Sequence, residues 1–175
     1  MELLQRNYFE LLGLATQFEI DLTLLDQHYR TLQSEVHPDR FVTASANERM
    51  QSMQVATQTN EAYQTLKNTT ARARYLLQLN GVETLEESNT AMPADFLMLQ
   101  MEWREAIDDA NTAKDVSALE ALLDEIKQMT KALSKNLSTQ FAEKAYEMAS
   151  ESVRKLSFID KIRADIHRAI EHLES

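Results

Sequence analysis

The sequence of 175 residues contains no cysteine, and it has only 2 glycines and 2 prolines. Without cysteine the chain has no disulfide, no thiolate metal site and no cysteine nucleophile. Sheets and hairpins need turn residues, so the scarcity of glycine and proline favours long helices. Leu, Ala, Glu and Lys, all good helix formers, are abundant, and hydrophobic residues, at 43%, are enough for a core. The composition therefore predicts an all-α protein.

Long apolar runs are missing as well. No stretch approaches the ~20 apolar residues that span a bilayer. Residues 1–20 carry Glu2, Glu10 and Glu19 among short apolar stretches, which is not the pattern of a signal peptide. A reducing cytosol suits a chain without cysteine. We expect a cytoplasmic protein with no membrane partner.

Positive charge is scarce, and the net charge is −10. Phosphate backbones would repel such a chain, so we expect no nucleic-acid partner. The acidity is uneven, because residues 1–75 hold 7 basic and 9 acidic residues while residues 76–175 hold 11 and 19. An acidic second half suggests a partner with a basic surface, although solvated acidic helices are the commoner explanation.

The first part of the sequence predicts four helices. A short one spans 8–14, with Gly13 near its end. A second spans 22–36, with apolar residues at helical spacing. The next two run from about 47 to 66 and from 71 to 79. The inner face of the third helix should consist of Met53, Ala56, Asn60, Tyr63 and Leu66.

His37, Pro38 and Asp39 follow the second of these helices. Proline fixes its own φ and pushes the preceding residue out of the α region, so that helix must end near Val36. We expect Asp39 to accept hydrogen bonds from nearby backbone N–H groups and to hold the turn. Two helices with facing apolar stripes form an antiparallel hairpin across such a connection. The tripeptide should therefore form a rigid tip that shows one imidazole and one carboxylate to solvent.

Residues 80–92 interrupt the helical pattern and are acidic and polar. We interpret them as a linker between a module at 1–79 and a second module at 93–175. Pro93 is well placed in the first turn of a helix that runs to about Asn111. Two further helices should follow, one from Asp115 and one that begins within 143–153 and ends near Leu173. Three long amphipathic helices with short connections predict an antiparallel three-helix bundle.

The predicted helix at 93–111 is apolar on two sides. At about 100° per residue, its core-facing side should consist of Phe96, Leu99, Trp103, Ile107 and Ala110. Leu97, Met98 and Met101 fall on the opposite side, beside the acidic residues Glu102, Glu105 and Asp109. Such a helix is either wholly buried or exposes a contact patch, and the acidic neighbours argue against burial. Methionine adapts to a partner's shape, and an acidic rim would steer a basic partner. Stray exposed residues, or contact with the first module, are the alternatives.

The polar residues form none of the common catalytic or metal-binding motifs. The sequence has no Glu-x-x-His, GxxxxGK, GxSxG or HExxH motif. We expect the four histidines, His28, His37, His167 and His172, to lie at the surface and to bind no metal. We therefore expect no catalytic residues, no cofactor and no enzymatic activity. An enzyme built on a helical bundle remains an alternative that no nucleophile or metal cluster supports.

Residues 1–75 resemble a J-domain, the module that activates ATP-driven chaperones of the DnaK class. The matching segments are Tyr8-Phe-Glu-Leu-Leu-Gly-Leu14, Tyr29-Arg30 with Leu32 before His37-Pro38-Asp39-Arg40, and Asn60-Glu-Ala-Tyr-Gln-Thr-Leu66. Nearly the whole chain is similar to the HscB family of iron–sulfur cluster co-chaperones. That resemblance rests on the segments Arg72–Leu77, Phe96–Met98 and Val153–Lys161.

The resemblance implies two partners. The J-domain would stimulate a DnaK-class (HscA-like) ATPase, and the C-terminal bundle would hold the iron–sulfur scaffold protein, the IscU type. It assigns chaperone binding to His37, Pro38, Asp39, Arg30 and Arg40. It assigns scaffold binding to Leu97, Met98, Met101, Glu102, Glu105, Asp109 and Phe158, and ordinary core packing is an alternative for Phe158.

The chain departs from the J-domain pattern on the helix before the tripeptide. Thr31 and Glu35 stand where many J-domains carry basic residues. The electrostatic contribution to chaperone docking should therefore be weak, and the choice of chaperone narrow. A J-protein that serves a different client is the alternative function.

Overall fold

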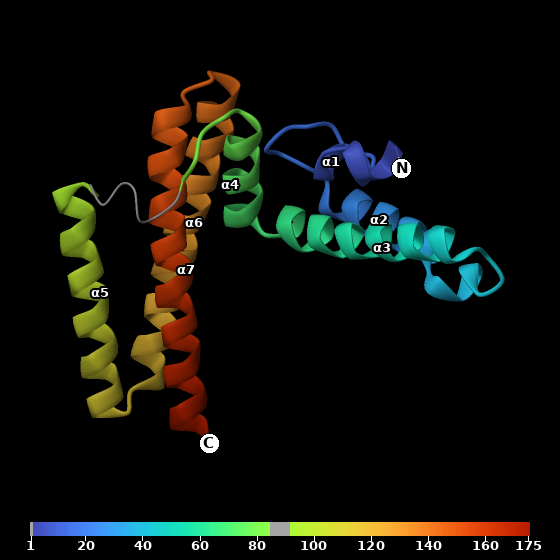
Figure 1. Ribbon diagram of the computed structural model, residues 1–175. Coiled ribbons are helices and arrows are strands. Elements are labelled where there is room, and N and C mark those ends of the chain that lie inside the picture. Colours follow the sequence, from blue (N-terminus) through green and yellow to red (C-terminus); the bar gives the residue numbers. More distant parts are fainter. Residues whose placement is uncertain (1, 85–91) are drawn as a thin grey trace. The chain divides into compact units, whose positions relative to one another are not determined.

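The structure is a computed structural model that describes residues 2–84 and 92–175. Within these two stretches every regular element is a helix, which confirms the all-α prediction (Figure 1). The chain forms two compact units, 1–79 and 80–175. Part of the interpreted linker, residues 85–91, lies outside the described residues.

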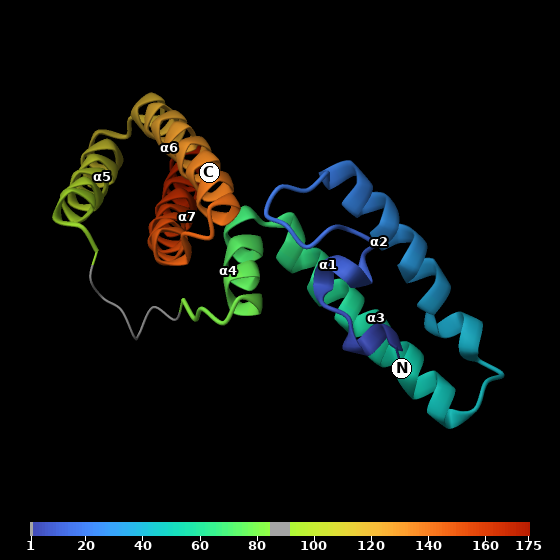
Figure 2. The same ribbon diagram turned by 90° about the horizontal axis from the view of Figure 1, so that it is seen from above.

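The first unit is built on two antiparallel helices, α2 (Leu22–Val36) and α3 (Ala46–Lys67), which lie side by side in Figures 1 and 2. A 3-10 helix, η1 (Glu2–Gln5), and the short helix α1 (Tyr8–Leu11) pack against α3. Helix α4 (Thr69–Leu79) follows α3 and also contacts it. This is the predicted hairpin with its flanking short helices.

The buried face of α3 differs from the predicted one. Of the predicted inner residues only Leu66 is buried, and Met53 is largely exposed. The buried residues are instead Ser52, Val55, Thr59, Ala62 and Leu66. Two of these are polar, and each returns its hydroxyl hydrogen bond to its own helix, Ser52 to Arg49 O and Thr59 to Val55 O. Hydroxyls whose hydrogen bonds are satisfied in this way can be buried at little free-energy cost. The face predicted from the apolar pattern is therefore displaced by one residue from the face that is buried.

A buried arginine connects two segments of the first unit. The guanidinium of Arg72, on α4, donates to the backbone carbonyls of Phe18, at 2.8 Å, and Leu66, at 2.7 Å. It also lies 5.1 Å from the centroid of the Phe18 ring. Burial lowers the pKa of Arg72, because the charged form loses hydration. This side chain ties the loop before α2 to the corner between α3 and α4.

Three helices end in the same way, with one residue in the left-handed region. These residues are Gly13 (φ 67°), Lys114 (φ 54°) and Lys144 (φ 55°). In each case the next residue donates a backbone hydrogen bond back into the helix, for example Asp115 N–H to Ala110 O at 2.9 Å. This is the Schellman arrangement. At Gly13 it ends α1 after Leu11, so the predicted helix over 8–14 is too long.

The second unit is a bundle of three long helices, α5 (Ala94–Ala113), α6 (Val116–Ala142) and α7 (Tyr146–Glu174). Successive helices run in opposite directions, which confirms the antiparallel bundle (Figure 1). The core consists of large apolar side chains, chiefly Phe96, Trp103, Ile107, Leu119, Leu122, Ile126, Leu133, Leu137, Leu156, Ile159, Ile162 and Ile166.

Residues 80–84 group with this second unit. Tyr146, in the first turn of α7, donates its hydroxyl to Asn80 Oδ1 at 3.0 Å, and Thr84 is buried.

Candidate functional site

The connection between α2 and α3 exposes the predicted tip. Helix α2 ends at Val36, and His37 takes an extended conformation (φ −58°, ψ 134°), as a residue before proline does. Pro38 begins a 3-10 helix, η2 (Pro38–Phe41), where its fixed φ and missing N–H are tolerated. His37, Pro38 and Asp39 are all exposed. The predicted display of an imidazole and a carboxylate to solvent is confirmed.

His37, and not Asp39, closes this turn. Its Nδ1 accepts a hydrogen bond from the backbone N–H of Asp39 at 3.2 Å. The prediction that the Asp39 carboxylate accepts from the backbone is wrong, because that side chain is 88% exposed and its contact is with His37 Nδ1 at 3.5 Å. A ring nitrogen that accepts carries no proton, so the neutral ring is protonated on Nε2. The tip therefore presents an N–H donor next to a solvated carboxylate.

A capping box fixes the far end of this connection. The Ser45 hydroxyl accepts from the backbone N–H of Glu48 at 3.2 Å, and the Glu48 carboxylate accepts from the backbone N–H of Ser45 at 3.0 Å. These reciprocal bonds satisfy donors at the start of α3 that have no partner within the helix. The tip is thus held between a proline-terminated helix and a capped one.

Two tyrosines brace α2 against α3 behind the tip. The rings of Tyr29 and Tyr63 are stacked with centroids 4.0 Å apart. Tyr29 donates its hydroxyl to Asn60 Oδ1, and Tyr63 donates to Asp26 Oδ1, each at 2.6 Å. The bond to Asp26 raises the pKa of Tyr63. The sequence analysis did not predict this contact. Both tyrosines lie in the segments that match the J-domain family, and an aromatic residue on each of two paired helices would have indicated it.

The two predicted docking cations flank the tip. Arg30 lies on α2 and Arg40 on η2, and both side chains are exposed. Within residues 2–84 and 92–175, no carboxylate forms an ion pair with either guanidinium. Both charges are therefore available to an external anion.

The second candidate surface is the outer face of α5. Leu97, Met98 and Met101 have exposed fractions of 44%, 62% and 70%, which confirms that they face solvent. Phe96 and Trp103 are buried on the opposite side, with their rings edge to face at 6.2 Å. We call the exposed residues the α5 patch, which consists of Leu97, Met98, Met101, Glu102, Glu105 and Asp109.

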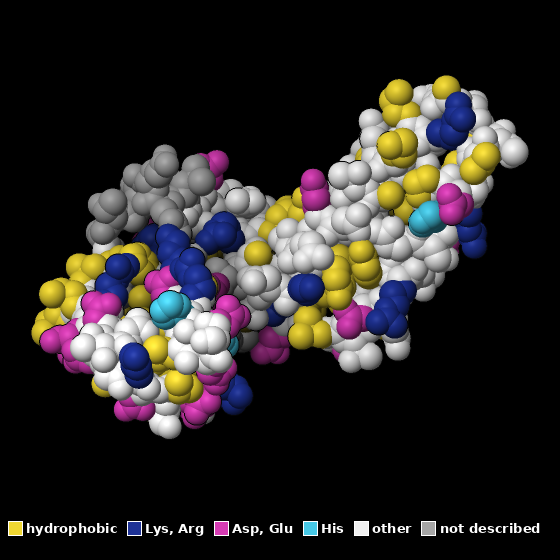
Figure 3. All heavy atoms as spheres, turned by 90° about the horizontal axis from the view of Figure 1, so that it is seen from below, with side chains coloured by type: hydrophobic (Ala, Val, Ile, Leu, Met, Phe, Trp, Pro, Cys, Tyr) yellow, Lys and Arg dark blue, Asp and Glu magenta, His cyan; other side chains and the backbone are white. Residues whose placement is uncertain are grey.

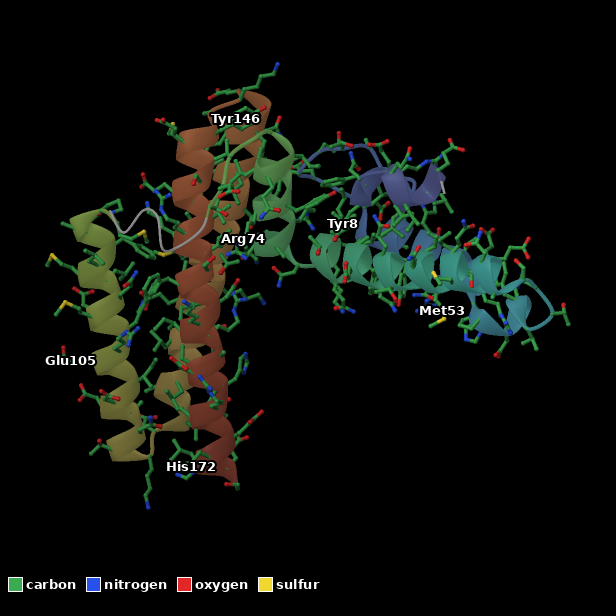
Figure 4. The ribbon with its side chains drawn as sticks, viewed as in Figure 1. Tyr8, Met53, Arg74, Glu105, Tyr146 and His172 are labelled. Atoms are coloured by element: carbon green, nitrogen blue, oxygen red, sulfur yellow. The ribbon has the colours of Figure 1, made fainter. Side chains whose placement is uncertain are left out.

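The acidic members of the α5 patch are exposed as well. Figure 4 shows Glu105 on the side of α5 that is turned away from α6 and α7. Figure 3 shows hydrophobic side chains next to acidic ones along the edge of the second unit that α5 forms. An exposed apolar group with an acidic rim is a typical protein-binding surface.

Phe158 lies on α7 and is half-buried. The amine of Lys161 lies 5.5 Å from the centroid of its ring. Three residues earlier, the amine of Lys155 lies 5.7 Å from the ring of Phe96 on α5. Residues three apart share a helix face, so Phe158 lies along the edge of α7 that borders α5. The structure therefore allows Phe158 to extend the α5 patch, and it does not make Phe158 a fully buried core residue.

An open groove of about 750 Å³ lies between α5 and α7, and no sequence pattern predicted it. It is lined by Arg104, Ile107, Asp108, Asn111, Lys114, Asp165, Arg168, Ala169, His172 and Leu173. None of the residues that line this groove carries a hydroxyl group.

The histidines do not form a metal site among the described residues, where no cluster of three ligands occurs. His28 is not the surface residue that we predicted, because it is half-buried and its Nδ1 lies 2.7 Å from the carbonyl oxygen of Leu12. None of the helices described is long and apolar enough to cross a membrane.

Comparison with known proteins identifies the family. The model of the HSCB C-terminal oligomerisation domain matches residues 92–167. The co-chaperone protein HscB homolog of Paraburkholderia phymatum is 46% identical over 175 residues, which is all of both chains. The chain belongs to the HscB co-chaperone family. Its first unit is accordingly the J-domain and its second the C-terminal bundle of an HscB-type protein.

Solved HscB structures share this fold. The chaperone HscB of Vibrio cholerae is 40% identical, with a TM-score of 0.86 over 96% of this chain and 99% of that one. Human co-chaperone HscB is 31% identical, with a TM-score of 0.87 over 93% of this chain and 81% of the human chain. The all-α HscB architecture therefore extends over nearly the whole sequence.

Proposed function

We propose that this chain is a co-chaperone in iron–sulfur protein maturation. Its J-domain would stimulate the ATPase of a DnaK-class, HscA-like chaperone, and its bundle would deliver an IscU-type scaffold protein to that chaperone. The observation that carries the proposal is the presence, in one HscB-family chain, of an exposed His37–Asp39 tip and an exposed apolar α5 patch. The role is binding and not catalysis.

The tip supports docking to the chaperone by its chemistry. A solvated Asp39 carboxylate can pair with a cationic side chain, and such charge-assisted hydrogen bonds are short and directional. The Nε2–H of His37 adds a donor beside it. Pro38 and the Asp39-to-His37 hydrogen bond restrict the backbone before docking, so less conformational entropy is lost when the partner binds.

The cations near the tip supply modest steering. Arg30 and Arg40 are exposed and have no intramolecular ion pair among the described residues. Glu35 on the same helix offsets part of their charge. We therefore propose that docking depends more on the rigid tip than on long-range attraction, and that it weakens only moderately with salt.

The α5 patch supports scaffold binding. Leu97, Met98 and Met101 offer exposed apolar area, and the two methionines can adjust to a partner's surface. The carboxylates of Glu102, Glu105 and Asp109 would steer a partner with basic residues. Phe158, at the neighbouring edge of α7, would extend the same surface.

The location follows from the proposed partner. We propose that the protein works in the cytoplasm, where ATP is available to such a chaperone.

Steady-state ATP hydrolysis by a purified HscA-like chaperone tests the proposal. The rate would be measured alone, with this chain, with the IscU-type scaffold, and with both together. A rise with the chain and a synergistic rise with both is the expected result. Stimulation without synergy would favour a J-protein that serves another client. Hydrolysis by this chain alone would instead favour an enzyme.

A further inference from the structure

Most of the methionines in the described part of this protein are exposed. The sequence has 8 methionines, and none of those in the described residues is among the buried core side chains. Five have exposed fractions above one half, namely Met50, Met53, Met98, Met101 and Met148. Methionine usually fills gaps inside cores. Because the chain has no cysteine, its sulfur groups are all thioethers, and these five are the most exposed of those that the structure describes.

Two of the five are part of the α5 patch. Met98 and Met101 are three residues apart on α5, so their side chains share one helix face. They are the most exposed of the large hydrophobic side chains on that helix, at 62% and 70%. Oxidants in solution would reach both sulfurs without any opening of the fold.

We propose that Met98 and Met101 form a reversible oxidation site that controls binding of the scaffold protein. The oxidant is a hydroperoxide. A lone pair on Sδ attacks one peroxide oxygen, the O–O bond breaks and an S–O bond forms. The departing oxygen takes up the peroxide proton and leaves as water or an alcohol. The thioether loses two electrons to the peroxide, and methionine sulfoxide reductases reverse the change.

Oxidation changes the chemistry of the docking face. A sulfoxide is polar, and its oxygen needs a hydrogen-bond donor once water is removed. Within one turn of α5, Met98 lies beside the carboxylates of Asp95 and Glu102, and Met101 lies beside Glu105 and the guanidinium of Arg104. Carboxylates only accept hydrogen bonds, whereas a guanidinium donates them. On this helix a sulfoxide oxygen at Met98 would therefore face acceptors and apolar atoms, and one at Met101 would have Arg104 as its nearby donor. The fold would be unaffected, because neither side chain belongs to the core.

This inference rests on the proposed scaffold-binding role of the α5 patch. The test uses the full chain, treated with hydrogen peroxide that is removed before the scaffold is added. Binding of an IscU-type scaffold is measured by calorimetry, and the oxidised residues are identified by mass spectrometry. We expect binding about tenfold weaker after oxidation, and recovery after treatment with a methionine sulfoxide reductase.

A matched pair of variants assigns the effect. A Met98→Leu, Met101→Leu double variant keeps the apolar face without the sulfurs. Its affinity for the scaffold before peroxide is its own reference, and that affinity should not change after peroxide. A Met53→Leu, Met148→Leu control removes two equally exposed sulfurs, at 59% and 61%, that lie elsewhere on α3 and α7. It should lose affinity on oxidation as the wild type does.

The possible failures are distinguishable. Equal affinity before and after oxidation of Met98 and Met101 overturns this inference and leaves the proposed function intact. A loss of helicity on oxidation overturns it too, because the effect would then be unfolding. Failure of the untreated chain to bind the scaffold overturns the proposed function, and this inference with it.

Discussion

The Nδ1 atom of His37 accepts a hydrogen bond from the backbone N–H of Asp39, at 3.2 Å. Through this bond the side chain of His37 fixes the backbone at Asp39, and the side chains of both residues remain in contact with solvent. The bond also fixes the ring tautomer, so that Nε2–H points outward. The tip thus combines local rigidity with exposed polar groups.

Replacement of His37 by Gln should abolish ATPase stimulation and leave the fold intact. A Gln amide is flexible and cannot hold a donor and an acceptor in the fixed positions of the imidazole ring. Steady-state ATPase assays with an HscA-like chaperone would measure the loss, and circular dichroism would check the fold. His172→Gln, at an exposed histidine of the second unit, is the matched control. Undiminished stimulation by the His37 variant would show that the tip does not act as proposed.

Replacement of Leu97, Met98 and Met101 together by Ala should weaken scaffold binding at least about tenfold. The stability of the chain should change by less than about 1 kcal/mol, because surface substitutions have small effects. Trp103→Ala, on the buried face of the same helix, should cost about 3–5 kcal/mol. Calorimetry and urea unfolding measure the two quantities. A triple variant that melts like the Trp103 variant would place the three residues in the core.

Arg72→Met should destabilise the first unit by about 3 kcal/mol. The variant keeps a long apolar stem but removes charged hydrogen bonds to two carbonyls, each of which is then buried without a donor. Urea unfolding followed by circular dichroism measures the loss, and fluorescence of Trp103, in the second unit, is the internal reference. Arg72→Lys keeps the charge but not the fork geometry, so an intermediate loss is expected. If the Met variant were as stable as the wild type, Arg72 would not hold the loop.

Gly13→Ala should destabilise the chain more than Gly81→Ala. Both glycines have positive φ, at 67° and 77°, so each substitution costs about 1 kcal/mol of backbone strain. A Cβ at Gly13 would also lie 2.9 Å from His28 Nδ1, whereas one at Gly81 would meet nothing within 4 Å. The ring cannot move away without losing its 2.7 Å contact with Leu12 O. Urea unfolding of both variants, and of Gly13→Ala with His28→Ala, measures the difference. Equal losses for the two glycines would exclude the clash.

The first unit should lose stability above pH 10. Burial raises the pKa of Tyr8 and of Tyr75 above the ordinary 10.0, and the bond to Asp26 raises that of Tyr63. A phenol whose pKa is higher in the folded state stabilises the fold fully below its unfolded pKa. That contribution disappears as pH rises through the folded pKa. Circular dichroism against pH would show the loss, while Trp103 fluorescence reports the second unit. A Tyr75→Phe variant should lose stability less steeply, and an unchanged slope would contradict this origin.

The sequence predicted the fold well wherever one physical signal dominated. The periodic apolar residues of α5, α6 and α7 form the core of one bundle, and periodicity located the buried and the exposed face of α5. The prediction of the third helix, 47–66, is close to the observed Ala46–Lys67. Local pattern therefore located these helices along the chain, although it misplaced the buried face of α3.

The errors occurred where tertiary contacts satisfied polar groups. Ser52 and Thr59 are buried because their hydroxyls bond to their own helix, and an apolar pattern does not show this. The Tyr29–Tyr63 brace depends on two helices being packed together. We predicted that the side chain of Asp39 would accept the hydrogen bond that holds the turn, but the ring of His37 accepts it. This depends on the orientation of the ring, which the sequence does not reveal.

Helices α5 and α6 end at lysines in a conformation that glycine adopts without strain. Each lysine in the left-handed conformation lowers the free energy of unfolding by about 1 kcal/mol. Glycine would recover only part of this, because it also raises the conformational entropy of the unfolded chain. The second unit is therefore less stable to heat than the same fold would be with glycine at these two positions. Lys114→Gly and Lys144→Gly are therefore the substitutions most suited to raising the melting temperature of the bundle.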